Sequence, residues 1–449
     1  MGEVAVAASA PGKVLLAGGY LVLDRAYTGL TFALDARVHA IVQPIATAEG
    51  HRPSEVEVRS PQFEQARWKY GYRSMGQDAG MEVTQLSTGP DRDLSRNQFI
   101  ETTLRYALSY VAAISSPAIP SASVTILADN DYYSGSPTQS DSSPRWSKYG
   151  VPLSKAHKTG LGSSAALVTA LTAAVLMFYL PRGAFDPNQE SHKRRLHNLA
   201  QAAHCAAQGK VGSGFDVASA VYGSCLYRRF SPAILGALPD AGSAGFMTGL
   251  RNLVEDNQSA TWDVEIHREA VQLPVGLRLV ICDVSGGSET PGMVKKVLAW
   301  RTENSERAHD VWSDLHKANQ ALANEMKLST GEPWIGMVRY LARIRRLLRL
   351  MGEESGVPIE PPAQTKLLDA CEGVVGVVGG VVPGAGGFDA IVLVIEDLPE
   401  TVKELEMLFS DWDFMGESGA TAKVQLLGVR QETNGVQREI LEPYIRYLA

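Results

Sequence analysis

The hydrophobic and polar positions of the chain follow two periods, which predict both helices and strands. Residues 167–180 are mostly apolar with the large side chains at helical spacing, so they predict a buried helix. Patterns with one apolar face predict further helices at residues 100–111, 192–208, 217–222, 292–300, 303–326, 334–351 and 399–409. Alternating or β-branched runs predict strands at residues 4–8, 14–17, 38–42, 56–58, 124–128, 224–230, 277–284, 390–395 and 424–427. This mixture in both halves indicates an α/β or α+β protein.

Several stretches break this pattern. Pro11-Gly12 predicts a turn between the first two strands, and residues 68–96 have no firm period, so we expect a long loop there. Residues 129–157 begin with a segment rich in Ser, Pro, Tyr and Asp, which predicts an exposed insertion, either a flap over a neighbouring site or a passive addition. Residues 231–262 are rich in Gly, Asp, Asn and Ser, and they divide the chain into expected domains 1–230 and 231–449.

Composition narrows the function classes. A length of 449 residues suggests two domains, and 45% hydrophobic with 20% charged residues is ordinary for a soluble globular protein. The net charge of −7 argues against nucleic acid or an anionic membrane as a partner. No apolar run reaches the roughly 20 residues that span a bilayer, and no signal sequence is visible, so a cytoplasmic location is expected. The four cysteines are scattered, which indicates a reducing compartment and no zinc site.

The loop before the apolar helix carries the first candidate chemistry. A helix start presents unpaired N–H groups, glycines allow close approach of an anion, and serine hydroxyls add donors, so this loop predicts a nucleotide phosphate site. One alternative is a serine that only caps the helix. A dinucleotide fingerprint is disfavoured because no strand precedes the loop, and no G-x-x-x-x-G-K-[ST] motif is present. The segment reads Lys158-Thr159-Gly160-Leu161-Gly162-Ser163-Ser164-Ala165.

Two further glycine-rich motifs flank this loop along the chain. The first reads Pro11-Gly12-Lys13-Val14-Leu15-Leu16-Ala17-Gly18-Gly19-Tyr20, and the last reads Pro383-Gly384-Ala385-Gly386-Gly387-Phe388-Asp389. The three motifs in this order resemble the GHMP kinase superfamily of small-metabolite kinases, which includes galactokinase, homoserine kinase and mevalonate kinase. The chain is most similar to the fungal-type phosphomevalonate kinases, because Gly18-Gly19-Tyr20 stands where mevalonate kinases and galactokinases usually carry Gly-Glu-His.

The resemblance implies an α+β fold with two domains and a site between them. The N-terminal β/α domain would contain an unusual left-handed crossover, and the C-terminal domain would be ferredoxin-like. The implied reaction transfers the γ-phosphoryl group of ATP to (R)-5-phosphomevalonate in the mevalonate pathway of isoprenoid biosynthesis. The alternatives are another superfamily member such as mevalonate kinase, or a catalytically inactive nucleotide or metabolite sensor. The expected partners are therefore ATP and phosphomevalonate, with the protein a monomer or homodimer.

The resemblance also assigns roles to individual residues. The backbone of residues 160–164 would hold the β- and γ-phosphates, and the Ser163 or Ser164 hydroxyl, with Ser164 preferred, would ligate Mg²⁺ that accompanies ATP. Lys13 and Lys158 would neutralise phosphate charge, unless Lys13 is only a surface lysine in a turn. Asp216 matches the catalytic aspartate of related kinases, and the alternative is a helix cap. Because a phosphate acceptor is already largely dianionic at neutral pH, we expect Asp216 to position groups rather than abstract a proton.

The acceptor site is predicted less directly. A strand end followed by a helix start at residues 285–290 predicts an anion nest, and glycines of the last motif would let the backbone approach the substrates. Asn97 and the helix after it are expected near the adenine by analogy. The basic cluster Arg343, Arg345, Arg346 and Arg349 predicts a solvated helix face rather than a ligand site. The expected substrate-binding residues are Lys13, Gly19, Tyr20, Ser213, Asp216, Ser285, Ser288, Thr290, Gly386 and Gly387.

Overall fold

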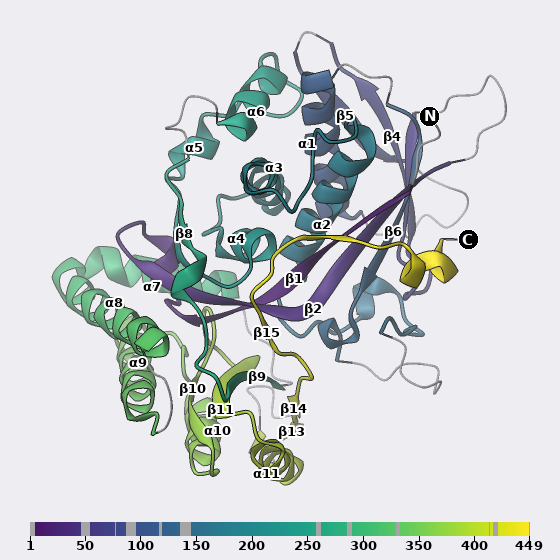
Figure 1. Ribbon diagram of the computed structural model, residues 1–449. Helices are drawn as coiled ribbons and strands as arrows, with labels where there is room; N and C mark the ends of the chain where they lie inside the picture. Colours follow the sequence, from purple (N-terminus) through teal and green to yellow (C-terminus); the bar gives the residue numbers. More distant parts are fainter. Residues whose placement is uncertain are drawn as a thin grey trace.

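The computed structural model describes most of the chain and arranges it around two sheets (Figure 1). The larger sheet has ten strands, from residues 6–267 and from residues 431–439 near the end of the chain; the smaller has four strands from residues 277–426. The α+β class with two parts is therefore confirmed. The described residues are 5–45, 54–76, 78–86, 96–115, 119–134, 145–256, 262–284, 290–328, 333–412, 414–415 and 421–448.

The large sheet is organised by the long antiparallel pair β1 and β2. Its main path runs β16-β1-β2-β6-β3-β4-β5; β7 and β15 also pair with β2, and β8 pairs with β7. All of these pairs are antiparallel except β3 with β6. The strands are β1 Val6–Ala17, β2 Thr28–Pro44, β3 Glu55–Arg59, β4 Arg67–Ser74, β5 Met81–Leu86, β6 Ala122–Ala128, β7 Cys225–Arg228, β8 Glu265–His267, β15 Gln431–Glu432 and β16 Gln437–Glu439.

Strand β1 corrects the predicted turn at Pro11-Gly12. The strand continues through both residues, and the pairing with β2 shifts register between Pro11 and Lys13. A bulge of this kind accommodates a proline, which has no N–H for the ladder, and it bends the strand. The turn prediction failed because a bulge uses the same residue types as a turn. The bend lies directly before Lys13, a residue that lines the candidate active site.

The expected loop at residues 68–96 is also wrong over its first part. Strands β4 and β5 pair antiparallel from Lys69 with Leu86 to Ser74 with Met81. In β4 the buried positions are Trp68, Tyr70 and Tyr72, which alternate with lysine, glycine and arginine. This period of two is the strand signal that the polar composition of the segment concealed. Residues 87–95 lie outside the described residues.

Helices of the first half cover one face of the large sheet, with α2 at the centre (Figure 1). Helix α2 contacts β1 and β2 on one side and α1, α3 and α4 on the others. Leu171 and Val175 are fully buried, so the all-round apolar composition reflects a central position and confirms the predicted buried helix. The helices are α1 Gln98–Ser115, α2 Ser163–Tyr179, α3 Glu190–Gln208, α4 Phe215–Tyr222, α5 Ala233–Gly236 and α6 Phe246–Glu255.

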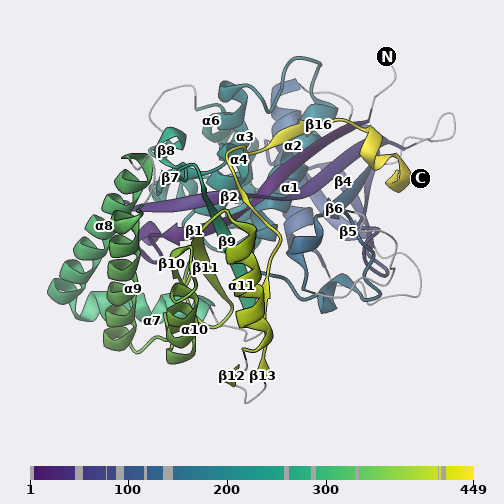
Figure 2. The same ribbon diagram turned by 60° about the horizontal axis from the view of Figure 1, so that its bottom comes forward.

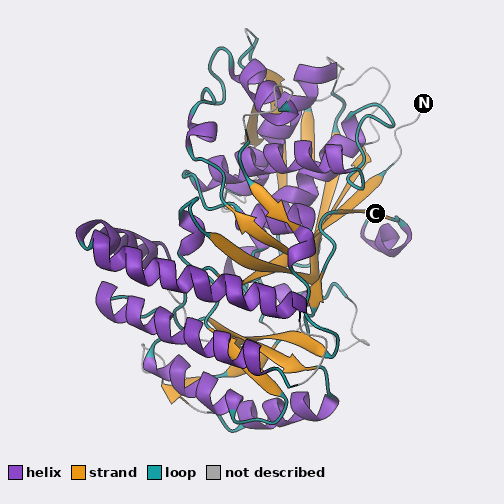
Figure 3. Cartoon of the chain, turned by 60° about the vertical axis from the view of Figure 1, so that its left-hand side comes forward, coloured by secondary structure: helices purple, strands orange, loops and turns teal. Residues whose placement is uncertain are grey.

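The second half forms a ferredoxin-like layer, as the resemblance implied. Its sheet is antiparallel with the order β10-β11-β9-β14, and helices separate β9 from β10 and β11 from β14. The long helices pack against one another beside this sheet (Figures 2 and 3). The elements are β9 Leu277–Val284, α7 Thr290–Glu303, α8 Ser305–Leu328, α9 Ile335–Ser355, α10 Pro362–Glu372, β10 Val377–Val381, β11 Ala390–Glu396, α11 Pro399–Ser410 and β14 Val424–Leu426, with a small pair β12 Phe414–Met415 and β13 Thr421–Ala422.

The end of the chain returns to the large sheet. Strand β15 pairs with β2 and β16 pairs with β1, and Figure 1 shows this segment in yellow along the sheet. Beyond β16 the Tyr444 hydroxyl lies 2.9 Å from His39 Nδ1 on β2. The division into 1–230 and 231–449 stays a prediction, and any division has to place β8, β15 and β16 with the first sheet.

Two surface properties complete the fold. Among the helices that the structure describes, none is both long enough and apolar enough to cross a membrane.

The arginines of α9 do not form one solvated face, because the Arg345 side chain is 3% exposed and donates hydrogen bonds to Glu360 and Asp369. The carboxylates that draw Arg345 inward come from α10 and the residues just before it, which a pattern within α9 alone does not show.

Candidate active site

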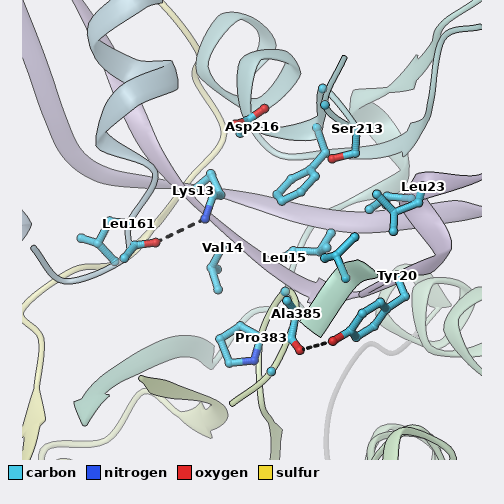
Figure 4. A pocket seen from close by; sticks show the side chains of 18 of the residues that line it. Lys13, Val14, Leu15, Tyr20, Leu23, Leu161, Ser213, Asp216, Pro383 and Ala385 are labelled. Carbon is cyan, nitrogen blue, oxygen red and sulfur yellow. Dashed lines mark hydrogen bonds between the residues drawn. The ribbon is translucent and has the colours of Figure 1, made fainter. Parts of the chain in front are cut away.

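A cavity of about 390 Å³ lies where the two halves of the chain meet. Strand β1, the loop before α2, the C-terminal end of α3, the loop before α4 and the β10–β11 loop all contribute lining residues. Figure 4 shows Lys13, Asp216 and Leu161 around one part of it, with Tyr20 and Ala385 in another. The three glycine motifs, far apart in sequence, are therefore joined in one cleft.

The loop before α2 has the geometry of an anion site. Gly160 and Gly162 have φ values of 71° and 80°, in the left-handed region that favours glycine. The first helical hydrogen bond runs from Ala166 N to Gly162 O, so the preceding N–H groups lie ahead of the helical ladder. No side-chain hydrogen bond caps α2, so the alternative of a serine that serves only as a cap is not observed.

Lys13 fixes this loop to β1 and faces the cavity. Its backbone N–H donates to Leu161 O at 2.8 Å (Figure 4). Its Nζ donates to Gly160 O at 3.3 Å. A Cβ at Gly162 would stand 2.8 Å from Lys13 Cε, so this glycine also leaves room for the lysine. Burial lowers the pKa of the Lys13 ammonium, and the nearby charge of Asp216 opposes that effect. A bound polyanion would stabilise the charged form further.

A cluster of three polar side chains lies near Lys13. It consists of Asp216, His204 and Ser164. Asp216 Oδ1 accepts a hydrogen bond from Val217 N at 3.0 Å in the first turn of α4. Its Oδ2 lies 3.8 Å from His204 Nε2, and the same nitrogen lies 3.2 Å from Ser164 Oγ. A hydroxyl and a carboxylate thus approach one histidine nitrogen from two different elements.

This donor set fits Mg²⁺ that arrives with phosphates. Magnesium prefers oxygen ligands, keeps several waters and needs few protein groups when phosphates supply the rest. Ser164 Oγ, which lines a neighbouring smaller cavity, and the Asp216 carboxylate, which lines the main cleft, both lie near His204 Nε2. Within the described ranges no cluster of three or more His, Cys, Asp or Glu side chains could hold a metal ion alone. A cation here would therefore depend on phosphate oxygens and water for most of its ligands.

The first and last glycine motifs touch at the other side of the cleft. A Cβ at Gly19 would stand 2.1 Å from Gly384 O, so no side chain fits between the two backbones. The Tyr20 hydroxyl donates to Ala385 O at 2.7 Å (Figure 4), and Gly384 N donates to Leu15 O at 3.3 Å. Tyr20 adopts a φ of 64°, which is strained for a residue with a large side chain. These contacts join the N-terminal and C-terminal parts of the chain beside the cavity.

The segment before α10 packs against the last glycine motif. Gly387 N donates to Ile359 O at 2.9 Å, and a Cβ at Gly386 would stand 2.1 Å from the same oxygen. The next residue, Glu360, is buried and accepts hydrogen bonds from Arg345 and Arg349. The arginine cluster therefore anchors the segment against which the glycines pack, a role that its sequence pattern did not predict.

A smaller apolar cavity of about 100 Å³ lies on the other side of the phosphate loop. Ser163, Ser164 and Lys158 line it together with Asn97 and Phe99, so Lys158 does not face the main cleft. Asn97 Oδ1 accepts a hydrogen bond from Ile100 N, which makes it a cap of α1 as well. It lies next to the phosphate loop, and its part in an adenine pocket stays a prediction.

The remaining predicted residues divide into three groups. Ser213 lines the main cleft, and its backbone oxygen accepts a hydrogen bond from the Tyr227 hydroxyl at 2.7 Å. Thr290 begins α7, but its side chain is not described. The proposed nest residues Ser285 and Ser288 lie outside the described residues.

Sequence reasoning missed several polar residues of α3 and its end. His204, Gln208 and Lys210 all line the main cleft. They lie within and just after a helix whose pattern predicted only amphipathic packing, and no motif was assigned to them. Their positions in the sequence could have indicated this role. His204 and Gln208 are one helical turn apart, and the helix leads into the glycine-rich loop before Asp216.

Comparisons with known proteins agree with this geometry. A family described as "GHMP kinases N terminal domain" matches residues 150–224. The phosphomevalonate kinase of Gibberella zeae is 50% identical over 443 residues, covering 98% of both chains. That of Aspergillus fumigatus is 46% identical, covering 98% of this chain and 97% of its own.

Solved structures show the same fold. A Streptococcus pneumoniae phosphomevalonate kinase in complex with phosphomevalonate and AMPPNP superposes with a TM-score of 0.63 at 16% identity, covering 96% of this chain and 100% of its own. A Listeria innocua protein, Lin0012, gives a TM-score of 0.67 at 17% identity, covering 97% of this chain and 99% of its own.

Proposed function

The chain belongs to the phosphomevalonate kinase family of GHMP kinases, and we propose that its cleft transfers the γ-phosphoryl group of ATP to (R)-5-phosphomevalonate. The products would be 5-diphosphomevalonate and ADP, a step of the mevalonate pathway. The observation that carries this assignment is the 50% identity to a phosphomevalonate kinase over 98% of both chains. The cleft adds a phosphate loop, a lysine and an aspartate in one cavity.

The donor half of the site would be the loop before α2. Gly160, Leu161 and Gly162 would present backbone N–H groups to the β- and γ-phosphates, and Ser163, Ser164 and Ala165 would continue them into the helix start. The positive φ values of the two glycines support this role, because they leave the backbone open to an anion. The small apolar cavity that includes Asn97 and Phe99 would take the adenine. Lys158, which lines that cavity, would stand near the nucleotide rather than the acceptor.

Mg²⁺ would enter with ATP and be held by Ser164 and Asp216. When bound, it would offset the charge of the phosphate groups during transfer. The 3.2 Å and 3.8 Å distances from His204 Nε2 to these two side chains support a common location for the two ligands.

The acceptor half would lie between β1, the loop before α4 and the last glycine motif. Lys13, Ser213 and Asp216 line the cavity there, and Tyr20 and Gly386 close its other side. Gly19 and Gly387 do not line this cavity and would shape it indirectly, Gly19 by its close contact with Gly384 O and Gly387 by its hydrogen bond to Ile359 O. The nest at Ser285, Ser288 and Thr290 stays a prediction.

The main electrostatic problem of this reaction is repulsion between two polyanions. Phosphoryl transfer depends chiefly on positioning and on stabilising charge at the transferred group. Lys13, placed between the phosphate loop and Asp216, is the cation that can meet both substrates. The start of α2 adds a partial positive charge from its backbone.

The test is an ADP-release assay of the purified protein with each acceptor. We expect turnover with phosphomevalonate and little with mevalonate, because mevalonate lacks the phosphate group that the cations of the cleft would bind. Turnover of mevalonate alone would instead identify a mevalonate kinase. ATP binding without ADP release from any acceptor would identify an inactive sensor. Cytoplasmic location and the monomer or homodimer state stay predictions, and one relative is named a peroxisomal enzyme.

Replacing Tyr20 by Phe is expected to weaken the contact between the two halves of the chain. Loss of the hydroxyl leaves the Ala385 carbonyl without its donor, which should cost about 1 kcal/mol of unfolding free energy in urea. Tyr72→Phe is a matched control, because its hydroxyl also donates at 2.7 Å, to Ile119 O, away from the cleft. Only Tyr20→Phe should raise the KM for the acceptor. Equal KM values in both variants would show that this contact does not shape the cleft.

A further inference from the structure

His204 lines the cleft, but none of the phosphate contacts proposed above uses it. It lies on α3, its side chain is almost fully buried, and it lines the main cavity. Its Nε2 is 3.2 Å from Ser164 Oγ and 3.8 Å from Asp216 Oδ2. The ring also lies 5.7 Å, centre to centre, from the Phe99 ring at the edge of the smaller cavity. One imidazole therefore touches the phosphate-loop serine and approaches the loop that carries the aspartate.

The neighbours of Nε2 indicate which partner donates the hydrogen bond. The Gln208 Nε2 amide, which can only donate, points to His204 Nε2 at 3.5 Å. Asp216 Oδ2, at 3.8 Å, is beyond hydrogen-bond distance of this nitrogen. Because the amide neighbour of Nε2 is an N–H donor, we infer that Nε2 is the acceptor. The hydrogen bond at 3.2 Å then runs from the Ser164 hydroxyl to His204 Nε2.

This direction matters for a serine that ligates a cation. A hydroxyl that binds a metal through its oxygen lone pair keeps its proton and needs an acceptor for it. Side chains behind the ligands commonly supply such acceptors and fix the orientation of the ligand. An imidazole nitrogen with a free lone pair can serve as that acceptor.

We propose that His204 is a positioning residue that accepts the Ser164 proton and thereby turns the serine lone pairs toward Mg²⁺ and the nucleotide phosphates. The proposal rests on the proposed use of Mg·ATP by this cleft, and it adds a residue that neither the motifs nor the comparisons assign. His204 touches no reacting atom in this scheme. It acts through Ser164.

A histidine on the same helix provides the matched control. His197 is also buried, but it contacts Asn198, Tyr222 and Trp262 and does not line the cleft. A substitution there tests the cost of losing a buried imidazole from α3. It leaves the serine unchanged.

The experiment measures binding of AMPPNP by calorimetry at a series of free Mg²⁺ concentrations, without any acceptor or turnover. His204→Leu is expected to weaken Mg²⁺-dependent binding about 10- to 100-fold, the range found when a residue behind a metal ligand is removed. Ser164→Ala should lose at least as much, because it removes the ligand itself. The double variant should lose little more than Ser164→Ala, because His204 acts through that serine. His204→Gln should recover most of the affinity, since its amide oxygen can accept the same hydroxyl proton.

Three outcomes would overturn the proposal. The first is additive losses in the double variant. The second is a His204→Leu protein that loses thermal stability, as His197→Leu should, but keeps normal Mg²⁺ dependence. The third is a His204→Gln protein as weak as His204→Leu. If His204→Leu does not fold, His204→Asn replaces it, because its amide is too short to reach Ser164. A wild-type protein that binds Mg·AMPPNP in this way but does not phosphorylate phosphomevalonate would refute the proposed function and leave this inference standing.

Discussion

Replacing Lys13 by Met is expected to lower kcat about 1,000-fold, which corresponds to roughly 4 kcal/mol of lost transition-state stabilisation. Methionine has a similar length and fills the space beside Phe215 and Gly162. The backbone bond from Lys13 N to Leu161 O survives, so the phosphate loop keeps its attachment to β1. The variant loses a positive charge that lies between the phosphate loop and Asp216.

The same substitution should not destabilise the unliganded protein. Burial lowers the pKa of Lys13, which means that the empty cleft disfavours its charge. Removing a desolvated ammonium should therefore leave Tm unchanged or raise it, as happens where function is maintained at the expense of stability. The pH profile gives a second check. The lysine acts as a cation, so kcat/KM of the wild type should fall as pH rises through the lowered pKa, and Lys13→Met should lose this limb.

Lys155→Met serves as the control for Lys13. Lys155 is exposed, ends the short 3-10 helix Leu153–Lys155, and lines neither cavity. It should keep wild-type kinetics. A Lys13→Met protein with normal kcat, or one whose activity loss matches a loss of folded protein, would contradict the electrostatic role.

The sequence predicted most of the elements, because their hydrophobic periods are long and local. The buried helix at α2 and the strand β9 were visible in this way. What it could not predict were features set by partners distant in the chain. Strand β1 passes through Pro11-Gly12 because β2 runs alongside it, and the last strands join the first sheet. Neither pairing leaves a trace in the local pattern.

The sequence predicted some residues of the candidate site and missed others. The phosphate loop was predicted because glycines and serines at a helix start favour anion binding, whereas Asp216 was predicted from the family resemblance. The structure places residues of the loop and Asp216 at the same cavity. His204 was missed because a histidine inside an amphipathic helix resembles ordinary packing, and only the fold brings it to Ser164. Arg345 was misassigned for the same reason, since its carboxylate partners lie after α9 in the chain. Residue type predicts what a side chain can do, whereas its partners come from topology.

Replacing Asp216 by Asn is expected to lower kcat/KM about 100-fold without changing the shape of its pH profile. The substrate explains this result. An acceptor phosphate has a second pKa near about 6, so it is already largely dianionic at neutral pH and needs no base. The acidic limb of the profile then belongs to the substrate, and it should persist in the variant. Asparagine also keeps an oxygen for the Val217 N–H, so α4 should retain its start and its stability.

The alternative for Asp216 gives a different profile. If the carboxylate abstracted a proton, the loss would follow the titration of that single base, and the variant would gain activity as hydroxide increased. Measuring kcat/KM of both proteins across roughly pH 5 to 9 separates the two cases, because this constant reports ionisations of free enzyme and free substrate. Asp216→Ala adds a structural control, since it removes the hydrogen bond to Val217 N as well as the charge. A profile in Asp216→Asn that is flat where the wild type bends near about 6 would assign the proton to the enzyme and refute the positioning role.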